Sequence, residues 1–179
     1  MLNKNAPPGG GAFLGRFVLL LALLVGCGGV LPERTRVRRV VDGDTVELQD
    51  GRLLRYIGID TPEVRRRVGD RWVVDPEPYG KAATEVNRRW VEGKGVRLEY
   101  DVQTHDRFGR LLAYVYVAEK SGTEMMVNAE LLRQGFAQPL TIPPNVRYAE
   151  RFRTLAAEAR DARRGLWSEA DEPAQRTRP

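Results

Sequence analysis

The sequence is almost without cysteine and histidine, and this scarcity limits the chemistry that it supports. Cys27 is the only cysteine among 179 residues, and His105 is the only histidine. A single cysteine cannot form an intrachain disulfide. Because there is no cluster of histidine and cysteine ligands, zinc and the softer transition metals are disfavoured as cofactors. A metal bound by this chain is therefore expected to rely on oxygen ligands.

Lysine is also scarce, whereas arginine is abundant. The 29 basic residues include four lysines, which are Lys4, Lys81, Lys94 and Lys120. The formal net charge is +5, and without residues 1–26 the chain has 27 basic against 24 acidic residues, or +3. A mild excess of this kind fits a polyanionic partner, but most mildly basic domains have no such partner. Individual arginine positions therefore carry the argument.

The apolar run near the N-terminus is too short to span a bilayer, which takes about 20 apolar residues. Arg16 precedes this run, which covers residues 17–25 and ends at Gly26-Cys27-Gly28-Gly29. A basic flank, a short apolar core and small residues are typical of a secretory signal. Leu24-Val25-Gly26-Cys27 also resembles the lipobox of bacterial lipoproteins, in which the cysteine becomes the lipid-bearing N-terminus. The alternatives are an uncleaved signal anchor and an ordinary secretory signal.

The chain is expected to consist of one domain with an extension at each end. We predict a signal peptide at 1–26, a lipidated Cys27 with a tether at 27–33, a domain at 34–168 and a flexible tail at 169–179. The protein is then exported and held in the cell envelope by lipid on Cys27, with a secreted soluble form as the alternative. No protein partner is predicted, and a monomer is expected.

Short strands dominate the first part of the expected domain. Alternation and β-branched residues predict strands at 35–41, 45–48, 53–57, 96–100 and 111–117. Apolar spacing predicts helices at 79–91, 127–133 and about 147–164. Segment 64–78 is expected to be a loop. This order suggests an α+β fold, namely a five-stranded Greek-key barrel of the OB type packed with about three helices.

Acidic residues lie where two of the predicted strands end. Asp42 and Asp44 flank a glycine between the first two strands, and Asp60 follows the third. Ends of neighbouring strands in a small barrel can lie side by side, so Asp44 and Asp60 could face one pocket. Two close carboxylates repel each other unless a cation is bound, and calcium prefers carboxylate and carbonyl oxygens. Asp-Gly-Asp is also compatible with an ordinary turn.

Glu63 follows Asp60 by three residues in the same turn. A carboxylate near a metal-bound water could take the proton of that water. The common alternative is a solvated surface acid. The sequence by itself leaves both interpretations open.

Two arginines are candidates for binding a phosphate. Arg55 shares a strand face with apolar Leu53 and Ile57, so it needs an anionic partner, unless it lies on an edge strand and reaches water. Arg110 lies beside Gly109 just before the last strand, where it could reach a bound anion or be a solvated hairpin charge. Two guanidinium groups on one phosphate would stabilise the charge that develops during attack.

Four motifs extend this pattern from about residue 35 to 167. They are Val41-Asp-Gly-Asp-Thr45, Arg55 followed after four residues by Asp60-Thr-Pro-Glu63, Asp106-Arg-Phe-Gly-Arg110-Leu-Leu-Ala-Tyr114, and Gly165-Leu-Trp167. Each motif alone is a weak signal. In this order and spacing they resemble the staphylococcal nuclease (thermonuclease) family.

The resemblance implies an OB-fold barrel with three helices. It also implies calcium-dependent cleavage of DNA and RNA that leaves 3′-phosphate ends. Asp44 and Asp60 correspond to the family's calcium carboxylates, and the Thr61 carbonyl is a further expected ligand. Calcium is therefore the expected cofactor, and nucleic acid the expected substrate.

The resemblance also implies the roles of the remaining site residues. Glu63 corresponds to the residue that orients or deprotonates the attacking water. Arg55 and Arg110 correspond to the two phosphate-binding arginines, and Arg107 to a basic contact with a neighbouring phosphate. Because this set is complete, a hydrolase is favoured over a non-catalytic OB-type binding module or an envelope scaffold.

Two departures from the family concern contacts to the base. Residues 138–142 contain no aromatic residue where the best-known member has tyrosines, and Phe108 replaces a tyrosine. Stacking on a base is worth about 1–3 kcal/mol, so nucleotide binding is expected to be weaker. The arginines of segment 64–78 could bind nucleic acid, or the segment could be a solvated loop.

Overall fold

The computed structural model describes residues 31–62, 65–68, 71–74 and 79–168, with the backbone alone for 65–68 and 71–74. The predictions for the signal peptide, Cys27, Glu63 and the tail at 169–179 fall outside these residues. Within the described part of the chain, no helix is both long and apolar enough to cross a membrane. The unit that begins at Leu31 has its own hydrophobic core.

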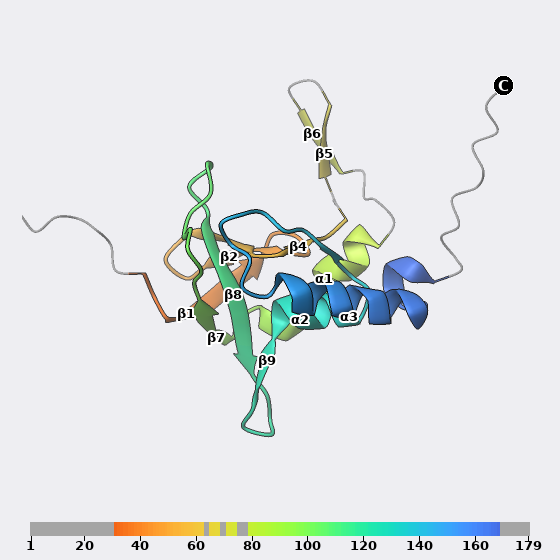
Figure 1. Cartoon of the computed structure of the whole chain (residues 1–179). Helices are drawn as coiled ribbons and strands as arrows, with labels where there is room; N and C mark the ends of the chain where they lie inside the picture. The colour runs from red at the N-terminus through yellow and green to blue at the C-terminus, as the bar shows by residue number, and fades with distance from the viewer. Residues whose placement is uncertain (1–30, 63–64, 69–70, 75–78, 169–179) are drawn as a thin grey trace, which may run out of the picture. The chain divides into compact units, whose positions relative to one another are not determined.

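A closed barrel forms the centre of this unit (Figure 1). Its sheet consists of β1 (Arg34–Val40), β2 (Thr45–Leu48), β3 (Leu53–Tyr56), β7 (Gly95–Glu99), β8 (Leu111–Ala118) and β9 (Glu124–Met126). The strand order is β3-β2-β1-β7-β8-β9. β3 also pairs in parallel with β8, and this pairing closes a barrel of five strands. The predicted five-stranded barrel of the OB type is confirmed.

In the described part of the chain three α-helices accompany the barrel, as predicted. They are α1 (Gly80–Val91), α2 (Val127–Arg133) and α3 (Ala149–Asp161), and a short 3-10 helix, η1, covers Gly165–Trp167. α1 packs against β1, while α2 packs against β8 and α3. The apolar residues of each helix face the core, among them Val86 of α1 and Phe152 of α3. Burial of these faces stabilises helices of this length more than intrinsic propensity does.

Segment 64–78 is not the loop that we expected. It contains an antiparallel hairpin of β5 (Arg65–Val68) and β6 (Arg71–Val74), in which Arg67 lies opposite Trp72. Three consecutive arginines hide the alternation that usually predicts a strand. Arg71-Trp72-Val73-Val74, however, is rich in residues that favour strands, so the prediction of a loop was wrong.

A two-residue strand pairing, also not predicted, fixes the position of Asp60. β4 (Ile59–Asp60) pairs with β10 (Gln138–Pro139), and Asp60 lies opposite Gln138. The approach to β4 requires a glycine, because Gly58 has a φ of +81° and a Cβ there would lie 2.6 Å from the ring of Phe152. Asp60 is therefore positioned by the segment that precedes α3.

Candidate active site

Asp44 lies in the turn between β1 and β2, and it is 4% exposed. Its Oδ2 accepts hydrogen bonds from the backbone N of Thr61 at 2.9 Å and from Thr61 Oγ1 at 3.1 Å. Its Oδ1 accepts one from Thr45 Oγ1 at 3.2 Å. A Cβ on Gly43 would lie 2.5 Å from Thr61 Oγ1, so only glycine allows this approach. Asp44 thus faces the segment after β4 rather than solvent.

Arg55 connects the two carboxylates that the sequence singled out. It lies on β3, which is flanked by β2 and β8, so the alternative of an edge strand is wrong. Its Nη2 donates to Asp60 Oδ1 at 2.7 Å, and its Nη1 forms an ion pair with Asp44 Oδ2. Nη1 is buried, and its contact with Asp44 lacks hydrogen-bond geometry. One guanidinium therefore joins the carboxylate of the β1–β2 turn to the carboxylate of β4.

The Asp44 carboxyl has a raised pKa even beside this arginine. Burial raises its pKa to about 7, against the opposing effect of the Arg55 guanidinium, and the nearby Asp42 raises it further. A buried carboxylate of this kind, with Asp60 close by, fits a hard cation that accepts oxygen ligands. Among the described residues, no three acidic, histidine or cysteine side chains form a metal cluster. Glu63 lies outside those residues.

Arg110 is oriented by an acid within its own turn. Its Nε donates to Asp106 Oδ2 at 2.6 Å, and its backbone N donates to Asp106 Oδ1 at 2.9 Å. Although burial opposes it, hydrogen bonding from Arg110 lowers the pKa of Asp106, so this carboxylate stays charged at neutral pH. The Arg110 side chain is 29% exposed, which excludes a fully solvated hairpin charge.

Arg55, Arg107 and Arg110 all line one open cavity of about 530 Å³. The same cavity has an apolar wall, formed by Phe108, Leu140 and Ile142, which are 69%, 38% and 61% exposed. The Arg107 guanidinium lies 4.7 Å from the centre of the Phe108 ring. Cationic groups beside an exposed apolar surface suit a ligand that has both a phosphate and a flat ring.

Asn145 links the two loops that border this cavity. Its Oδ1 accepts a hydrogen bond from Gln103 N at 2.8 Å, and its Nδ2 donates to Gln103 O at 2.8 Å. Asn145 is 6% exposed, so these two bonds are shielded from water. The Pro-Pro-Asn turn is thereby fixed beside the turn that contains Arg107 and Arg110.

Most of the predicted site residues lie together. Asp44, Asp60, Thr61 and Arg55 form one bonded group, and Arg55 shares the cavity with Arg107 and Arg110. Glu63 cannot be placed, because it lies outside the described residues. The sequence analysis missed the positioning contacts of Asp106 and Asn145. The contact of Asp106 could have been predicted, because this acid lies four residues before Arg110. The sequence contains no signal for the contact of Asn145 with Gln103.

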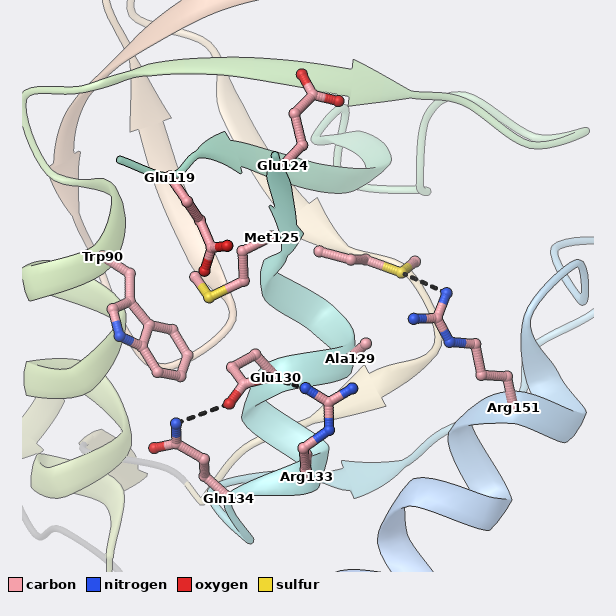
Figure 2. Close-up of a pocket in the computed structure, with 10 residues that line it drawn as sticks. Trp90, Glu119, Glu124, Met125, Ala129, Glu130, Arg133, Gln134 and Arg151 are labelled. Carbon is pink, nitrogen blue, oxygen red and sulfur yellow. Dashed lines mark hydrogen bonds and ion pairs between the residues drawn. The ribbon is translucent and has the colours of Figure 1, made fainter. Parts of the chain in front are cut away.

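A second pocket, of about 520 Å³, is bordered by residues of α1, α2 and β9 (Figure 2). Its carboxylates already have partners within the protein. Glu124 Oε2 accepts from Arg97 Nε at 2.7 Å, and Glu130 Oε1 accepts from Gln134 Nε2 at 2.8 Å. Arg151 Nη1 lies 3.8 Å from Met126 Sδ. We therefore assign the candidate active site to the cavity beside Arg55.

A closed barrel of five strands with a polar site at its strand ends places the chain among OB-fold proteins. Residues 53–169 match the family described as staphylococcal nuclease homologue, and the chain belongs to this family. It is 38% identical to a thermonuclease of Staphylococcus hyicus over 140 residues, 74% of this chain and 75% of that protein. It is 36% identical to a thermonuclease of Staphylococcus intermedius over 143 residues, 75% and 76% of the two chains. Endonuclease YncB of Bacillus subtilis is 34% identical over 137 residues, 74% of this chain and 60% of that protein.

Proposed function

We propose that this chain is a calcium-dependent nuclease that hydrolyses phosphodiester bonds in DNA, RNA or both and leaves 3′-phosphate ends. The observation that carries the proposal is the position of Arg55. It joins the carboxylates of Asp44 and Asp60 and lines the cavity that Arg107 and Arg110 also border. Arg55 thus connects a candidate metal site to a cationic cavity, an arrangement that suits phosphodiester hydrolysis.

The class of reaction follows from family membership. The chain is a hydrolase that acts on phosphodiester bonds, in keeping with its similarity to proteins named thermonuclease and endonuclease. Nucleic acid is accordingly the substrate. Calcium dependence, the product ends and the role of each residue are proposals that rest on the site described above.

Asp44, Asp60 and the carbonyl of Thr61 are the groups that would hold calcium. Their oxygen chemistry suits this ion, and the raised pKa of buried Asp44 indicates that Arg55 does not fully compensate its charge. Calcium bound there would supply positive charge for a phosphate oxygen and a site for water. This role differs from that of Arg55, which would contribute directional hydrogen bonds.

The protein side chains would bind and orient the reacting phosphate. Arg55 and Arg110 would each donate hydrogen bonds to its nonbridging oxygens, and these bonds would strengthen as charge develops during attack. Glu63 would orient the water and accept its proton. The water oxygen forms a bond to phosphorus, the P–O5′ bond breaks, and the departing 5′-oxygen takes a proton from solvent to become a hydroxyl. Arg107 would contact the neighbouring phosphate.

Removing calcium, or the carboxylate of Glu63, is expected to abolish cleavage while binding persists. The reason is that Arg55, Arg107 and Arg110 attract the phosphates in either case. Cleavage of single-stranded DNA and of RNA should be measured with calcium and with a chelator, beside a Glu63→Ser variant. The release of phosphate from the new ends by a 3′-phosphatase should be measured to identify the products.

The alternative is an OB-type module that binds nucleic acid without turnover. It predicts binding without cleavage in any metal, and full binding by Glu63→Ser. Cleavage that continues unchanged with chelator would instead contradict the proposed calcium site. We also propose a monomer, which light scattering of the purified chain would test.

A separate proposal concerns location. We infer that the chain is exported and anchored in the cell envelope by lipid on Cys27, because Leu24-Val25-Gly26-Cys27 resembles a lipobox. Cys27→Ala is expected to abolish incorporation of radiolabelled fatty acid in a bacterial host and to release the protein from the membrane fraction. A Met125→Ala variant, which leaves the N-terminal motif intact, is the matched control. Persistent labelling of Cys27→Ala would rule out lipid on this residue.

A further inference from the structure

The outer face of β1 is unusually basic. Arg34, Arg36, Arg38 and Arg39 occupy four of its seven positions, and Val37 and Val40 face the core. All four arginines are exposed, with side-chain exposures of 76% for Arg34, 66% for Arg38 and 56% for Arg39. We call Arg34, Arg36, Arg38 and Arg39, together with Arg89 and Lys94, the β1 basic face.

The acidic partners of these four arginines are too few to neutralise them. A register shift between Val37 and Arg39 brings both Arg38 and Arg39 to Glu47, so one carboxylate serves two guanidinium groups. Arg34 lies 4.0 Å from Glu124, which is already bound by Arg97 at 2.7 Å. Arg36 Nη1 donates to the backbone carbonyl of Gly93 at 2.6 Å, which provides no negative charge.

Two further cations extend this face at the end of α1. Val37 N donates to Lys94 O at 3.0 Å, so Lys94 lies directly beside β1. Lys94 Nζ donates to the backbone carbonyl of Arg89 at 2.9 Å, and both residues are exposed. Glu92 lies near this end of β1, but its Oε2 accepts a hydrogen bond from Val40 N at 2.8 Å and also pairs with Arg88. Among the described residues, the acidic partners of the six cations of the face are thus Glu47 and a shared Glu124, so positive charge is in excess.

The β1 basic face lies on a different wall of the barrel from Arg55 and Arg110, although the turn after β1 contains Asp44. The strands follow the order β3-β2-β1-β7-β8, and the barrel closes between β3 and β8. β1 is therefore two strands from this closure in either direction. Arg55 is on β3 and Arg110 directly precedes β8, so the phosphate-binding cavity does not account for the charge on β1.

The chain enters β1 by a short route from Cys27. Tyr100 OH donates to Pro32 O at 2.9 Å, Leu98 N donates to Glu33 O at 2.8 Å, and Leu31 packs against the core. Residues 31–33 are therefore attached to the barrel. Cys27 precedes Pro32 by five residues, which span at most about 17 Å when fully extended. A lipid on Cys27 would keep β1 within that distance of the headgroups.

We propose that the β1 basic face binds the anionic headgroups of the membrane, so that the wall with Arg55 and Arg110 is turned away from the bilayer toward nucleic acid. Anionic lipids attract clustered arginine and lysine residues close to the surface. A basic patch of this kind also strengthens the membrane anchoring that a covalent lipid provides. The orientation rests on the proposed lipid on Cys27, whereas the affinity of the face for headgroups does not.

The test uses a chain that begins at Gly28, which contains the whole compact unit but no lipid. Its sedimentation with vesicles of phosphatidylglycerol and phosphatidylcholine is compared with that on phosphatidylcholine alone. The variant is Arg34→Gln, Arg36→Gln and Arg38→Gln combined. The matched control removes three exposed arginines of α3 by Arg151→Gln, Arg153→Gln and Arg160→Gln.

We expect salt-sensitive binding to the anionic vesicles only, weakened roughly 100-fold by the β1 substitutions, while the α3 variant keeps most of its affinity. Cleavage of single-stranded DNA should be unchanged in both variants. Absent binding by the wild-type chain, or equal losses in the two variants, would overturn the proposal. A loss of DNA cleavage with unchanged vesicle binding would assign the face to nucleic acid instead. Because this chain has no lipid, these outcomes are independent of whether Cys27 is modified.

Discussion

Arg55→Lys is expected to lower kcat for cleavage of single-stranded DNA by about 10²–10³-fold, the usual effect of removing one preorganised donor to a transition state. Lysine keeps the positive charge but not the planar pair of donors. In the wild type these donors reach Asp44 and Asp60 while the side chain lines the cavity. A single ammonium cannot serve both carboxylates and a phosphate. Single-turnover kinetics with saturating calcium would measure the effect on the chemical step.

Arg52→Lys is the matched control for this experiment. Arg52 directly precedes β3, and its side chain is 40% exposed and bound to Asp50. Arg52 neither lines the cavity nor contacts Asp44 or Asp60. The kcat of the Arg52→Lys variant should therefore stay close to that of the wild type. Thermal unfolding of both variants would show whether they are folded. Near wild-type turnover by a folded Arg55→Lys protein would refute the assignment of Arg55 to the phosphate.

Asn128→Leu is expected to lower the free energy of unfolding by about 2–6 kcal/mol. Asn128 is completely buried at the start of α2. Its Oδ1 accepts from Val115 N and its Nδ2 donates to Ile57 O, both at 2.9 Å. Leucine has a similar volume but leaves both backbone groups buried without a partner. Such a loss is a large fraction of the stability of an ordinary domain, and urea unfolding followed by circular dichroism would measure it.

Gln134→Leu offers a comparison at the other end of α2. Gln134 Nε2 donates to Glu130 Oε1 at 2.8 Å in a half-buried position, where water can replace the bond. Its free energy of unfolding should change by about 0.5 kcal/mol or less. If Asn128→Leu proved equally mild, the two backbone groups would have to find other partners, and the proposed link between α2, β8 and the segment after β3 would be wrong.

The hydrogen bond between Asn128 and Ile57 shows how the position of the site residues depends on the core. Ile57, the acceptor of the Asn128 bond, follows Arg55 by two residues, and Ile57 N donates to Ala113 O of β8 at 3.1 Å. The segment between Arg55 and Asp60 is thus bonded to α2 and to β8. Arg55 and Asp60 are consequently held in fixed relation by buried hydrogen bonds rather than by their own ion pair alone. Precise placement of this kind is what electrostatic stabilisation of a transition state requires.

Local features of this protein can be predicted from its amino-acid sequence. The amphipathic spacing of Ala82, Ala83, Val86 and Trp90 predicts α1, and alternation predicts the main barrel strands. The order and spacing of Asp44, Arg55, Asp60 and Arg110 were enough to indicate the family. These signals are readable because each depends on residues that are close in the chain.

The contacts between those residues depend on nonlocal pairing, which local sequence patterns do not predict. β4 and β10 are two residues long and pair across almost eighty positions, so neither segment contains a pattern that predicts the other. Local sequence also does not predict that Arg55 lies on a strand with neighbours on both sides, because this depends on the parallel pairing of β3 with β8. Asp44 accepts a hydrogen bond from Thr61, and Asn145 accepts one from Gln103, and each bond joins segments that are distant in the chain. Residue type and local spacing determine which chemistry is available, whereas nonlocal pairing and burial determine which groups lie within bonding distance.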